Sequence, residues 1–410
     1  MRPASLDEGK LLAQLREMGA VGRTPEGGRT RHAASDEDGE ARDLLVRWMR
    51  EVGLDVRVDR IGNIFGILAG ENGRLDGACM VGSHIDTVTN AGALDGCYGV
   101  LSGLAVARAF LTEGVRPKRP LIVAAFTNEE GVRFQPDMMG SLAFAGGISA
   151  EEALAATDDE GRSLGSELER IGYAGEEPLP IATPGEYLEL HVEQGPILDG
   201  EGVQIGVVEG VQGIWWWRIT VRGTANHAGT TPLALRHDAG HAAARIVTFL
   251  REMAKATPAT LATVGTMAFR PGSINVVPSE AVFTVDLRDP ERACLLAAEE
   301  KIAVFTARVA EEEEVSVVMD QLVRFDPVSF DGGLLDLIEQ AAAEKGFSSR
   351  RMASGAGHDA QMMARLCRSA MIFVPSRGGV SHSPAEHTED DQLIRGAEVL
   401  LRVVSRLICP

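Results

Sequence analysis

Two periodicities of apolar residues alternate along the first part of the chain. Residues 5–20 and 40–51 have the apolar spacing of helices, and Gly53 ends the second segment. Ser5 and Glu8 have the spacing of a capping box, which predicts that the first helix begins there. The segments that follow are shorter and more apolar, as expected for strands.

Strands and helices then follow one another in regular alternation. The pattern predicts a hairpin at 55–70, a strand at 77–88, a buried helix at 98–114 and a strand at 121–126. Such alternation indicates an α/β sheet with helices on its faces. The last of these strands is wholly apolar and runs into two adjacent glutamates, Glu129 and Glu130.

The stretch from 213 to 324 has a different order of elements. Its pattern predicts strand, helix, two strands, helix and strand, which is the βαββαβ order of a ferredoxin-like domain. Trp215 and Trp217 alternate with apolar residues and are expected in its core. We therefore predict an α/β fold with a mixed sheet. Its catalytic domain comprises residues 1–212 and 325–410, interrupted by an inserted domain at 213–324.

Composition narrows the range of partners. Asp and Glu number 59 against 40 Lys and Arg, giving a formal net charge of −19 at pH 7. Such an acidic surface disfavours nucleic acids and anionic membranes as partners. No apolar run approaches the roughly 18 residues of a membrane span. The five cysteines are scattered and the N-terminus lacks an apolar signal region, so we expect a cytoplasmic protein.

Histidines and carboxylates gather where predicted strands end. Five such residues are His84, Asp95, Glu130, His191 and His382. Open α/β sheets carry functional groups at these ends, and imidazoles with carboxylates suit Zn²⁺ or a similar divalent ion. Asp86, two residues after His84, can fix the second ring nitrogen of that histidine. Taken alone, each residue also has an ordinary structural explanation, such as a helix N-cap for Asp95.

The paired glutamates can serve two separate roles. Adjacent residues of an extended chain point to opposite sides, so one glutamate can bind metal while the other acts as a general base towards the attacking water. Metal ions assist such attack by lowering the pKa of a water that they bind to about 7. The alternative is a solvated strand end that carries two surface charges.

Arg288 belongs to a predicted strand whose apolar residues alternate with polar ones. Alternation places Arg288 on the face opposite to the apolar residues, where its guanidinium can bind a carboxylate through two hydrogen bonds. A salt bridge to Asp286 or Asp289 within the inserted domain is the alternative role.

Eight motifs occur in order over nearly the whole chain. They are GSHIDTVTNAGALDG, FTNEEGVRF, ELHVEQGPIL, NHAGTTP, GSINVVP, DLRD, SGAGHDAQMMA and PSRGGVSHSPAEHT. Together they resemble the two-metal amidohydrolases related to aminoacylase and carboxypeptidase G. The branch that they resemble most contains N-carbamoyl-L-amino acid hydrolase, β-ureidopropionase and allantoate amidohydrolase.

The resemblance implies a dinuclear metal site. Asp95 would bridge two divalent ions, with His84 and His191 on one ion and Glu130 and His382 on the other. Zn²⁺ is the ion expected, and Mn²⁺, Co²⁺ and Ni²⁺ suit the same ligands. His387 shares a loop with His382 but is not the ligand in this pattern.

The resemblance also implies roles around the metals and in the inserted domain. Glu129 would be the general base and Asp86 the partner of His84. The residues expected to contact the substrate are Gln194, His227, Asn275, Arg288, Gly357 and His358. Among these, Asn275 and Arg288 would hold the substrate carboxylate, and His227 would reach the carbonyl oxygen from the partner subunit. The inserted domain would act as a lid and as the contact of a homodimer.

These expectations define the reaction. We predict hydrolysis of a C–N bond in a ureido acid, an N-carbamoyl-L-amino acid above all, to the amino acid, CO₂ and ammonia. Allantoate amidohydrolase and β-ureidopropionase are alternatives, because their substrates carry the same ureido and carboxylate groups. A peptidase or aminoacylase ranks third. A metal-binding but inactive small-molecule sensor is the alternative of another class, which the presence of Glu129 and a complete ligand set disfavours.

Overall fold

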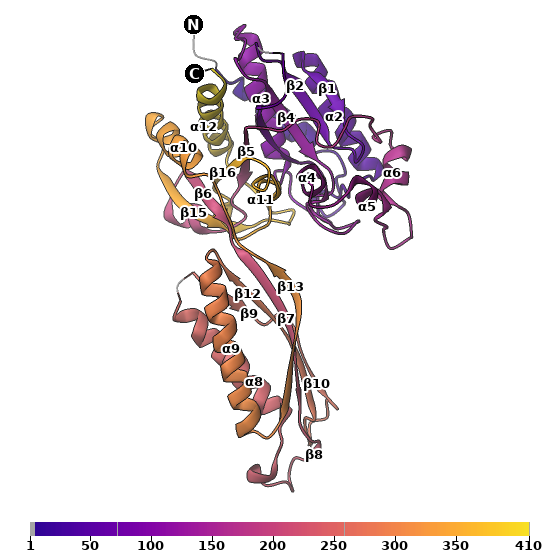
Figure 1. The fold of residues 1–410 in the computed structure, drawn as a ribbon, viewed down its shortest axis with the longest axis vertical. Helices are drawn as coiled ribbons and strands as arrows, with labels where there is room; N and C mark the ends of the chain where they lie inside the picture. The colour runs from indigo at the N-terminus through magenta and orange to yellow at the C-terminus, as the bar shows by residue number, and fades with distance from the viewer. Residues whose placement is uncertain (1–4, 72, 258, 410) are drawn as a thin grey trace. The chain divides into compact units, whose positions relative to one another are not determined.

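The computed structural model describes residues 5–71, 73–257 and 259–409. The chain folds into two compact units. Unit 1 consists of Met1–Gly210 and Ser329–Pro410, and unit 2 consists of Val211–Val328. Figure 1 shows both units and labels many of their helices and strands.

Unit 1 is built on one mixed sheet. Its strands are β1 (Asp55–Val58), β2 (Ile64–Leu68), β3 (Cys79–His84), β4 (Leu121–Phe126), β5 (Glu186–Val192), β6 (Ile205–Val211), β14 (Val328–Ser329), β15 (Ser349–Ser354) and β16 (Arg368–Val374). They are ordered β1-β2-β4-β3-β5-β16-β6-β14, and β15 pairs with β6. The central strands β4, β3, β5 and β16 are parallel, whereas β2 and β6 join them in antiparallel fashion. The predicted α/β fold with a mixed sheet is confirmed.

Helices pack around this sheet. They are α1 (Glu8–Met18), α2 (Asp36–Val52), α3 (Cys97–Thr112), α4 (Met139–Phe144), α5 (Ala150–Ala155), α6 (Leu164–Arg170), α7 (Ile197–Glu201), α10 (Gly332–Glu344), α11 (Asp359–Met363) and α12 (Asp390–Ile408), with a 3₁₀ turn η2 (Arg377–Gly379). The largely apolar α3 packs against β3, β4 and β5, and α12 packs against α3 and β16. Within the described residues, no helix has the length and apolar content that crossing a bilayer requires.

Side-chain caps decide where the first two helices begin. The carboxylate of Asp7 accepts a hydrogen bond from the main-chain N–H of Lys10 at 3.0 Å, so Asp7 is the N-cap of α1. The capping box predicted on Ser5 is therefore wrong. Helix α2 begins earlier than predicted because the side chain of Ser35 caps it, and it ends where predicted, at Gly53, whose φ is 99°.

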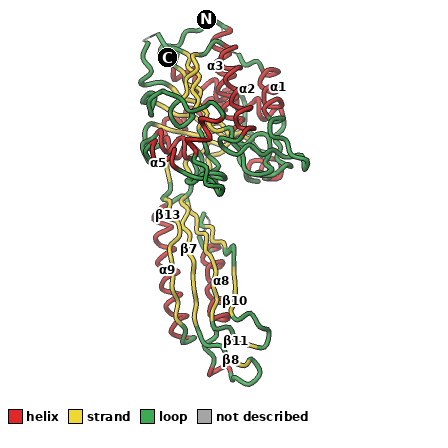
Figure 2. The backbone as a smooth tube through the Cα atoms, turned by 90° about the vertical axis from the view of Figure 1, so that its right-hand side faces the viewer, coloured by secondary structure: helices red, strands yellow, loops and turns green. Residues whose placement is uncertain are grey.

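Unit 2 is an antiparallel sheet with two long helices. Its elements are β7 (Gly213–Arg222), β8 (Asn226–His227), η1 (Leu233–Leu235), α8 (Ala239–Lys255), β9 (Leu261–Thr263), β10 (Met267–Arg270), β11 (Val276–Val277), β12 (Glu280–Asp289), α9 (Arg292–Glu312) and β13 (Ser316–Phe325). The strand order is β10-β12-β7-β13, and β9 also pairs with β12. Figure 2 shows α8 and α9 running alongside these strands, and β8 and β11 forming a small ribbon at one end.

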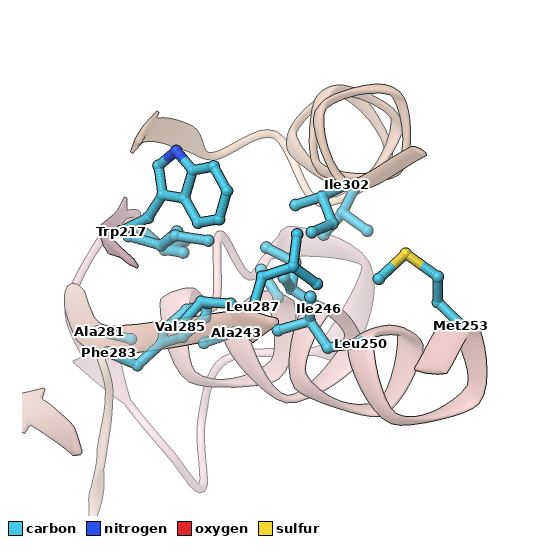
Figure 3. Close-up of a cluster of buried hydrophobic side chains, with 14 of the residues drawn as sticks. Trp217, Ala243, Ile246, Leu250, Met253, Ala281, Phe283, Val285, Leu287 and Ile302 are labelled. Atoms are coloured by element: carbon cyan, nitrogen blue, oxygen red, sulfur yellow. The ribbon is translucent and has the colours of Figure 1, made fainter. Parts of the chain in front are cut away.

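The core of unit 2 lies between its sheet and its helices. Alternate residues of β12 are buried, and Phe283 and Leu287 are fully so. Figure 3 shows these side chains facing Ile246 of α8 and Ile302 of α9. Burial of each large apolar side chain stabilises the unit by about 1.5 to 3 kcal/mol. The same alternation in β7 buries Trp215 and Trp217 in this core and leaves Trp216, between them, 39% exposed.

Candidate metal centre

The parallel strands of unit 1 bring the candidate ligands to one edge of the sheet. His84 is the last residue of β3, and His191 is the last but one of β5. Glu130 follows β4 and His382 follows β16. Because these four strands are neighbours and run in the same direction, their carboxyl ends meet at one place.

Asp95 lies between two histidines of this edge. Its Oδ1 is 3.1 Å from Nε2 of His191 and 3.6 Å from Nε2 of His84. The Nδ1 atoms of these rings lie 3.0 Å from the carbonyl oxygen of Asp86 and 2.8 Å from that of Val192. When each Nδ1–H donates to its carbonyl, Nε2 carries no proton, as a metal-binding nitrogen requires. These three side chains form a group able to hold one ion.

The other oxygen of Asp95 faces a second group. Oδ2 is 3.1 Å from Nε2 of His382, which in turn lies 3.7 Å from Oε2 of Glu130. Asp95, Glu130 and His382 can therefore hold another ion, with Asp95 shared by both groups. His387, in the same loop as His382, lies beside Glu389 instead, at 3.4 Å. The structure thus brings the five predicted ligands together in the predicted pairing.

A glycine allows the first histidine to approach Asp95. Gly96 precedes α3 with φ of 64°, a left-handed conformation that side chains disfavour. A Cβ atom at this position would lie 2.5 Å from Cε1 and Nε2 of His84. The N–H of Gly96 also donates to Nε2 of His191 at 3.1 Å. Glycine is therefore required by both conformation and space.

The two glutamates stand on a turn rather than on a strand. Strand β4 ends before them, and Asn128 adopts φ of 58°, so the argument from an extended chain does not apply. The carboxylate of Asp86 holds the turn instead: its oxygens accept the main-chain N–H groups of Glu129 and Glu130, each at 3.2 Å. Asp86 thus fixes both glutamates, a role beyond the partner of His84 that was predicted for it.

The side chains of the two glutamates diverge from this turn. Oε2 of Glu129 lies 3.5 Å from Nε2 of His84, and Glu129 belongs to neither group of metal ligands. Glu130 belongs to the second group, and its other oxygen accepts the N–H of Val88 at 3.2 Å. One glutamate therefore faces each side of the site.

The site holds several buried carboxylates close together, an arrangement that bound cations would stabilise. Burial raises the pKa of Glu129, and His84 offsets this only in part. Burial and the nearby Asp95 raise the pKa of Glu130 to about 7. The pKa of His382 is raised to about 9 by its hydrogen bond to Asp95. Divalent ions would relieve the repulsion among these carboxylates. The donor set of imidazoles and carboxylates therefore fits two such ions.

Gln194 lies against the ligands rather than apart from them. Its Nε2 donates to Oδ2 of Asp95 at 3.0 Å and to Oγ of Ser381 at 3.3 Å. The same nitrogen is 3.4 Å from Nε2 of His382. Gln194 was predicted to contact substrate, and its amide stands at the edge of the metal site, where such a contact stays a prediction.

His358 is buried against His191, one of the candidate ligands. It is 2% exposed, and its ring meets that of His191 edge to face at 4.7 Å between centroids. Its Nε2 lies 2.9 Å from Oγ of Ser354, and burial together with His191 lowers its pKa well below the usual value. These surroundings suit a residue that orients His191 better than the substrate contact predicted for it. Gly357, predicted with it, lies beside Met138.

The candidates of unit 2 lie at two ends of its sheet. Strand β8, which carries His227, pairs with β11. Just beside this pair, the carbonyl of Asn275 accepts the N–H of Ala228 at 2.9 Å. Both His227 and Asn275 are exposed. They flank the ribbon at the end of the sheet where Glu280 pairs with Arg222 (Figure 2).

Arg288 lies at the opposite end of the same strand. It pairs with Ile214, eight residues along β12 from Glu280, which corresponds to about 26 Å. Its guanidinium donates to Asp286 at 2.8 and 2.9 Å, which is the salt bridge considered as an alternative role. One copy of unit 2 therefore does not bring Arg288 and Asn275 to the same ligand.

Sequence reasoning missed two buried glutamates of the site. Glu189 lies two residues before His191 on the same face of β5, so alternation could have revealed it. Its carboxylate accepts Oγ–H of Ser83 at 2.6 Å and the N–H of Ala360 at 2.8 Å. Because protein donors engage it, Glu189 is better explained as a brace than as a metal ligand. The second is Glu386, four residues after His382 in the same loop.

Comparison with known proteins identifies the family. The model of the peptidase family M20/M25/M40 matches residues 80–406. The chain belongs to this family. It is 40% identical over 397 residues to an N-carbamoyl-L-amino-acid amidohydrolase of Rhizobium meliloti, which covers 96% of this chain and 95% of that one. An allantoate amidohydrolase of Bacillus subtilis is 34% identical over 390 residues, 94% of each chain.

A solved structure with a similar fold belongs to a protein of related description. An amidase of the hydantoinase/carbamoylase family from Burkholderia multivorans is 39% identical, with a TM-score of 0.95 over 99% of each chain. The resemblance drawn from the sequence motifs is therefore confirmed, and so is the predicted class of enzyme, a hydrolase. Enzymes of the M20 family depend on two metal ions, in agreement with the two groups of candidate ligands that share Asp95.

Proposed function

We propose that this chain hydrolyses the ureido C–N bond of an N-carbamoyl-L-amino acid, releasing the amino acid, CO₂ and ammonia. One observation carries the proposal: two candidate metal groups share Asp95, and Glu129 stands beside them without belonging to either. The relatives at 40% and 39% identity named N-carbamoyl-L-amino acid amidohydrolases support this choice of substrate.

Five residues would hold the metal ions, with Zn²⁺ the ion proposed. Asp95 would bridge them, His84 and His191 would bind one, and Glu130 and His382 would bind the other. Bound divalent ions acidify water and polarise a carbonyl group, which is the chemistry that amide hydrolysis needs.

Glu129 would move the proton. Its carboxylate takes a proton from the attacking water and delivers it to the nitrogen that leaves as ammonia. Burial raises the pKa of Glu129, which makes it a stronger base than an exposed glutamate. Asp86 keeps this side chain in place, because it accepts the main-chain N–H of Glu129 at 3.2 Å.

Unit 2 would act as a lid that binds the substrate carboxylate and carbonyl, and as the contact of a homodimer. Arg288 and Asn275 would hold the carboxylate, and His227 would donate to the carbonyl oxygen. The separation of about 26 Å along β12 supports two chains at each site, since one chain cannot present Arg288 and Asn275 to one substrate. The guanidinium of Arg288 would then leave the carboxylate of Asp286 and bind that of the substrate.

Allantoate is the second candidate substrate. The Bacillus subtilis relative named allantoate amidohydrolase is 34% identical over nearly the full chain, and allantoate also presents ureido and carboxylate groups. The proposed cytoplasmic location rests on the cysteine pattern and stays a prediction.

A substrate panel tests the function. The purified chain, loaded with Zn²⁺, Mn²⁺, Co²⁺ or Ni²⁺, would be assayed for ammonia release from N-carbamoyl-L-amino acids, N-carbamoyl-β-alanine and allantoate. We expect the highest kcat/KM on an N-carbamoyl-L-amino acid, and its loss on chelation. Full activity after chelation would refute the metal role, and preference for allantoate would select the second candidate.

A further inference from the structure

Glu386 joins two loops that carry metal ligands. It lies after β16 in the loop of His382 and is 9% exposed. Its Oε1 accepts the main-chain N–H groups of Leu94 and Asp95, at 2.9 and 3.3 Å. Its Oε2 accepts Oγ–H of Ser381 at 2.8 Å. One carboxylate therefore binds the main chain at Leu94 and Asp95 and the side chain of Ser381, the residue before His382.

Gln194 completes a ring of hydrogen bonds around Asp95. Its Nε2 donates to Oγ of Ser381 at 3.3 Å and to Oδ2 of Asp95 at 3.0 Å. Glu386 thus fixes the main chain of Asp95, Gln194 fixes the carboxylate, and Ser381 connects the two. None of these three residues supplies an atom to the two groups of candidate ligands.

The loop needs such support because of the backbone at His382. Its φ of 51° lies in the left-handed region, which residues other than glycine rarely adopt. A conformation of this kind persists only where the surroundings hold it. Ser381, the residue before it, is bound directly by Glu386.

The loop that carries Gly92 and Asp95 leaves room for the carboxylate of Glu386. Gly92 packs against Glu386 so closely that a Cβ atom at position 92 would overlap its carboxyl group and its Cβ. Gly92 has no left-handed backbone that would itself call for glycine. The requirement at position 92 is therefore one of space.

We propose that Glu386 is a positioning residue that sets the separation of Asp95 and His382, and thereby the affinity of the second metal ion. The inference rests on the proposed metal site. The first ion should depend on it less, because His84 and His191 are oriented by the carbonyls of Asp86 and Val192 instead. Loss of an outer partner of this type lowers metal affinity about 10- to 100-fold.

Cobalt titration of the full chain tests this role. Calorimetry and the visible absorption of bound Co²⁺ would follow wild type, E386A, E386Q and G92A. E389Q, in the same loop and bound to Arg377, is the matched control. We expect E386A and G92A to bind the second Co²⁺ about 10- to 100-fold more weakly and the first less than about tenfold more weakly. E386Q should recover much of the loss, because its amide oxygen still accepts both N–H groups.

The outcomes separate the two proposals. Unchanged affinities in both E386A and G92A, or an equal loss for both ions, would overturn the positioning role. Should E386A fail to fold by circular dichroism, G92A decides in the same way. A wild-type chain that binds no Co²⁺ would instead refute the proposed metal site itself.

Discussion

Replacing each of the two adjacent glutamates by glutamine tests whether catalysis and metal binding depend on different side chains. Glu129 belongs to neither ligand group and lies 3.5 Å from His84, whereas Glu130 belongs to the group of Asp95 and His382. Glutamine keeps the volume of each side chain but accepts no proton. We therefore expect E129Q to lose turnover with both metal ions in place, and E130Q to lose one ion.

The size of each effect follows from these positions. A general base contributes about 10²- to 10⁴-fold to a rate, so E129Q should raise the activation barrier by about 3 to 5 kcal/mol. Loss of an outer partner of a metal ligand lowers metal affinity about 10- to 100-fold, so loss of Glu130, proposed as a direct ligand, should lower the affinity for one ion by more than about 100-fold.

Metal content and turnover should be measured on the same samples. Mass spectrometry after gel filtration would count the ions, and ammonia release from an N-carbamoyl-L-amino acid would give kcat. E209Q is the control, since Glu209 is an exposed residue of β6 away from both groups. Loss of an ion from E129Q with both retained in E130Q would reverse the assigned roles. Wild-type turnover in E129Q would refute the general base.

Three further changes test the fold around and beyond the site. G96A places a Cβ 2.5 Å from the His84 ring at φ of 64°, so it should bind one fewer ion in a metal titration; two ions at wild-type affinity would contradict this. Burial raises the pKa of Asp59 to about 7 in the folded protein, whereas an unfolded Asp has a pKa of about 3.9. The protonated side chain of Asp59 therefore contributes fully to stability below about pH 4, and this contribution is lost as the pH rises towards 7. D59N should therefore lose less stability than wild type in urea unfolding between pH 5 and 7, and parallel curves would refute the shift. F283A should destabilise unit 2 by about 3 to 5 kcal/mol in urea unfolding, whereas F269A, at an exposed position, should change little; equal effects would contradict the core assignment.

Much of the fold could be predicted from local patterns in the sequence. Strand β4 and helix α3 follow from runs of apolar residues, and Gly53 ends α2 as its position in the pattern predicts. The candidate ligands were found because each lies at or after the end of a predicted strand, where α/β sheets carry functional groups. Alternation was also sufficient to place Trp215 and Trp217 in the core of unit 2.

Features that depend on distant contacts could not be predicted in this way. The order of the strands in unit 1 is set by packing across the chain, which no short pattern encodes. The role of Glu386 depends on a hydrogen bond to Leu94, 292 residues away. The turn that separates Glu129 from Glu130 needs the left-handed Asn128, so a rule for extended chains could not describe it.

The points where the chain leaves and re-enters unit 1 have a practical consequence. Strands β6 and β14 are neighbours in the sheet, and the N–H of Phe330 donates to the carbonyl of Glu209 at 2.9 Å. The two ends created by excising Val211–Val328 would therefore already be adjacent, and a short hairpin turn can join them. All five candidate ligands lie outside the excised segment. A shortened protein of this design would allow metal loading to be studied without the substrate-binding role proposed for unit 2.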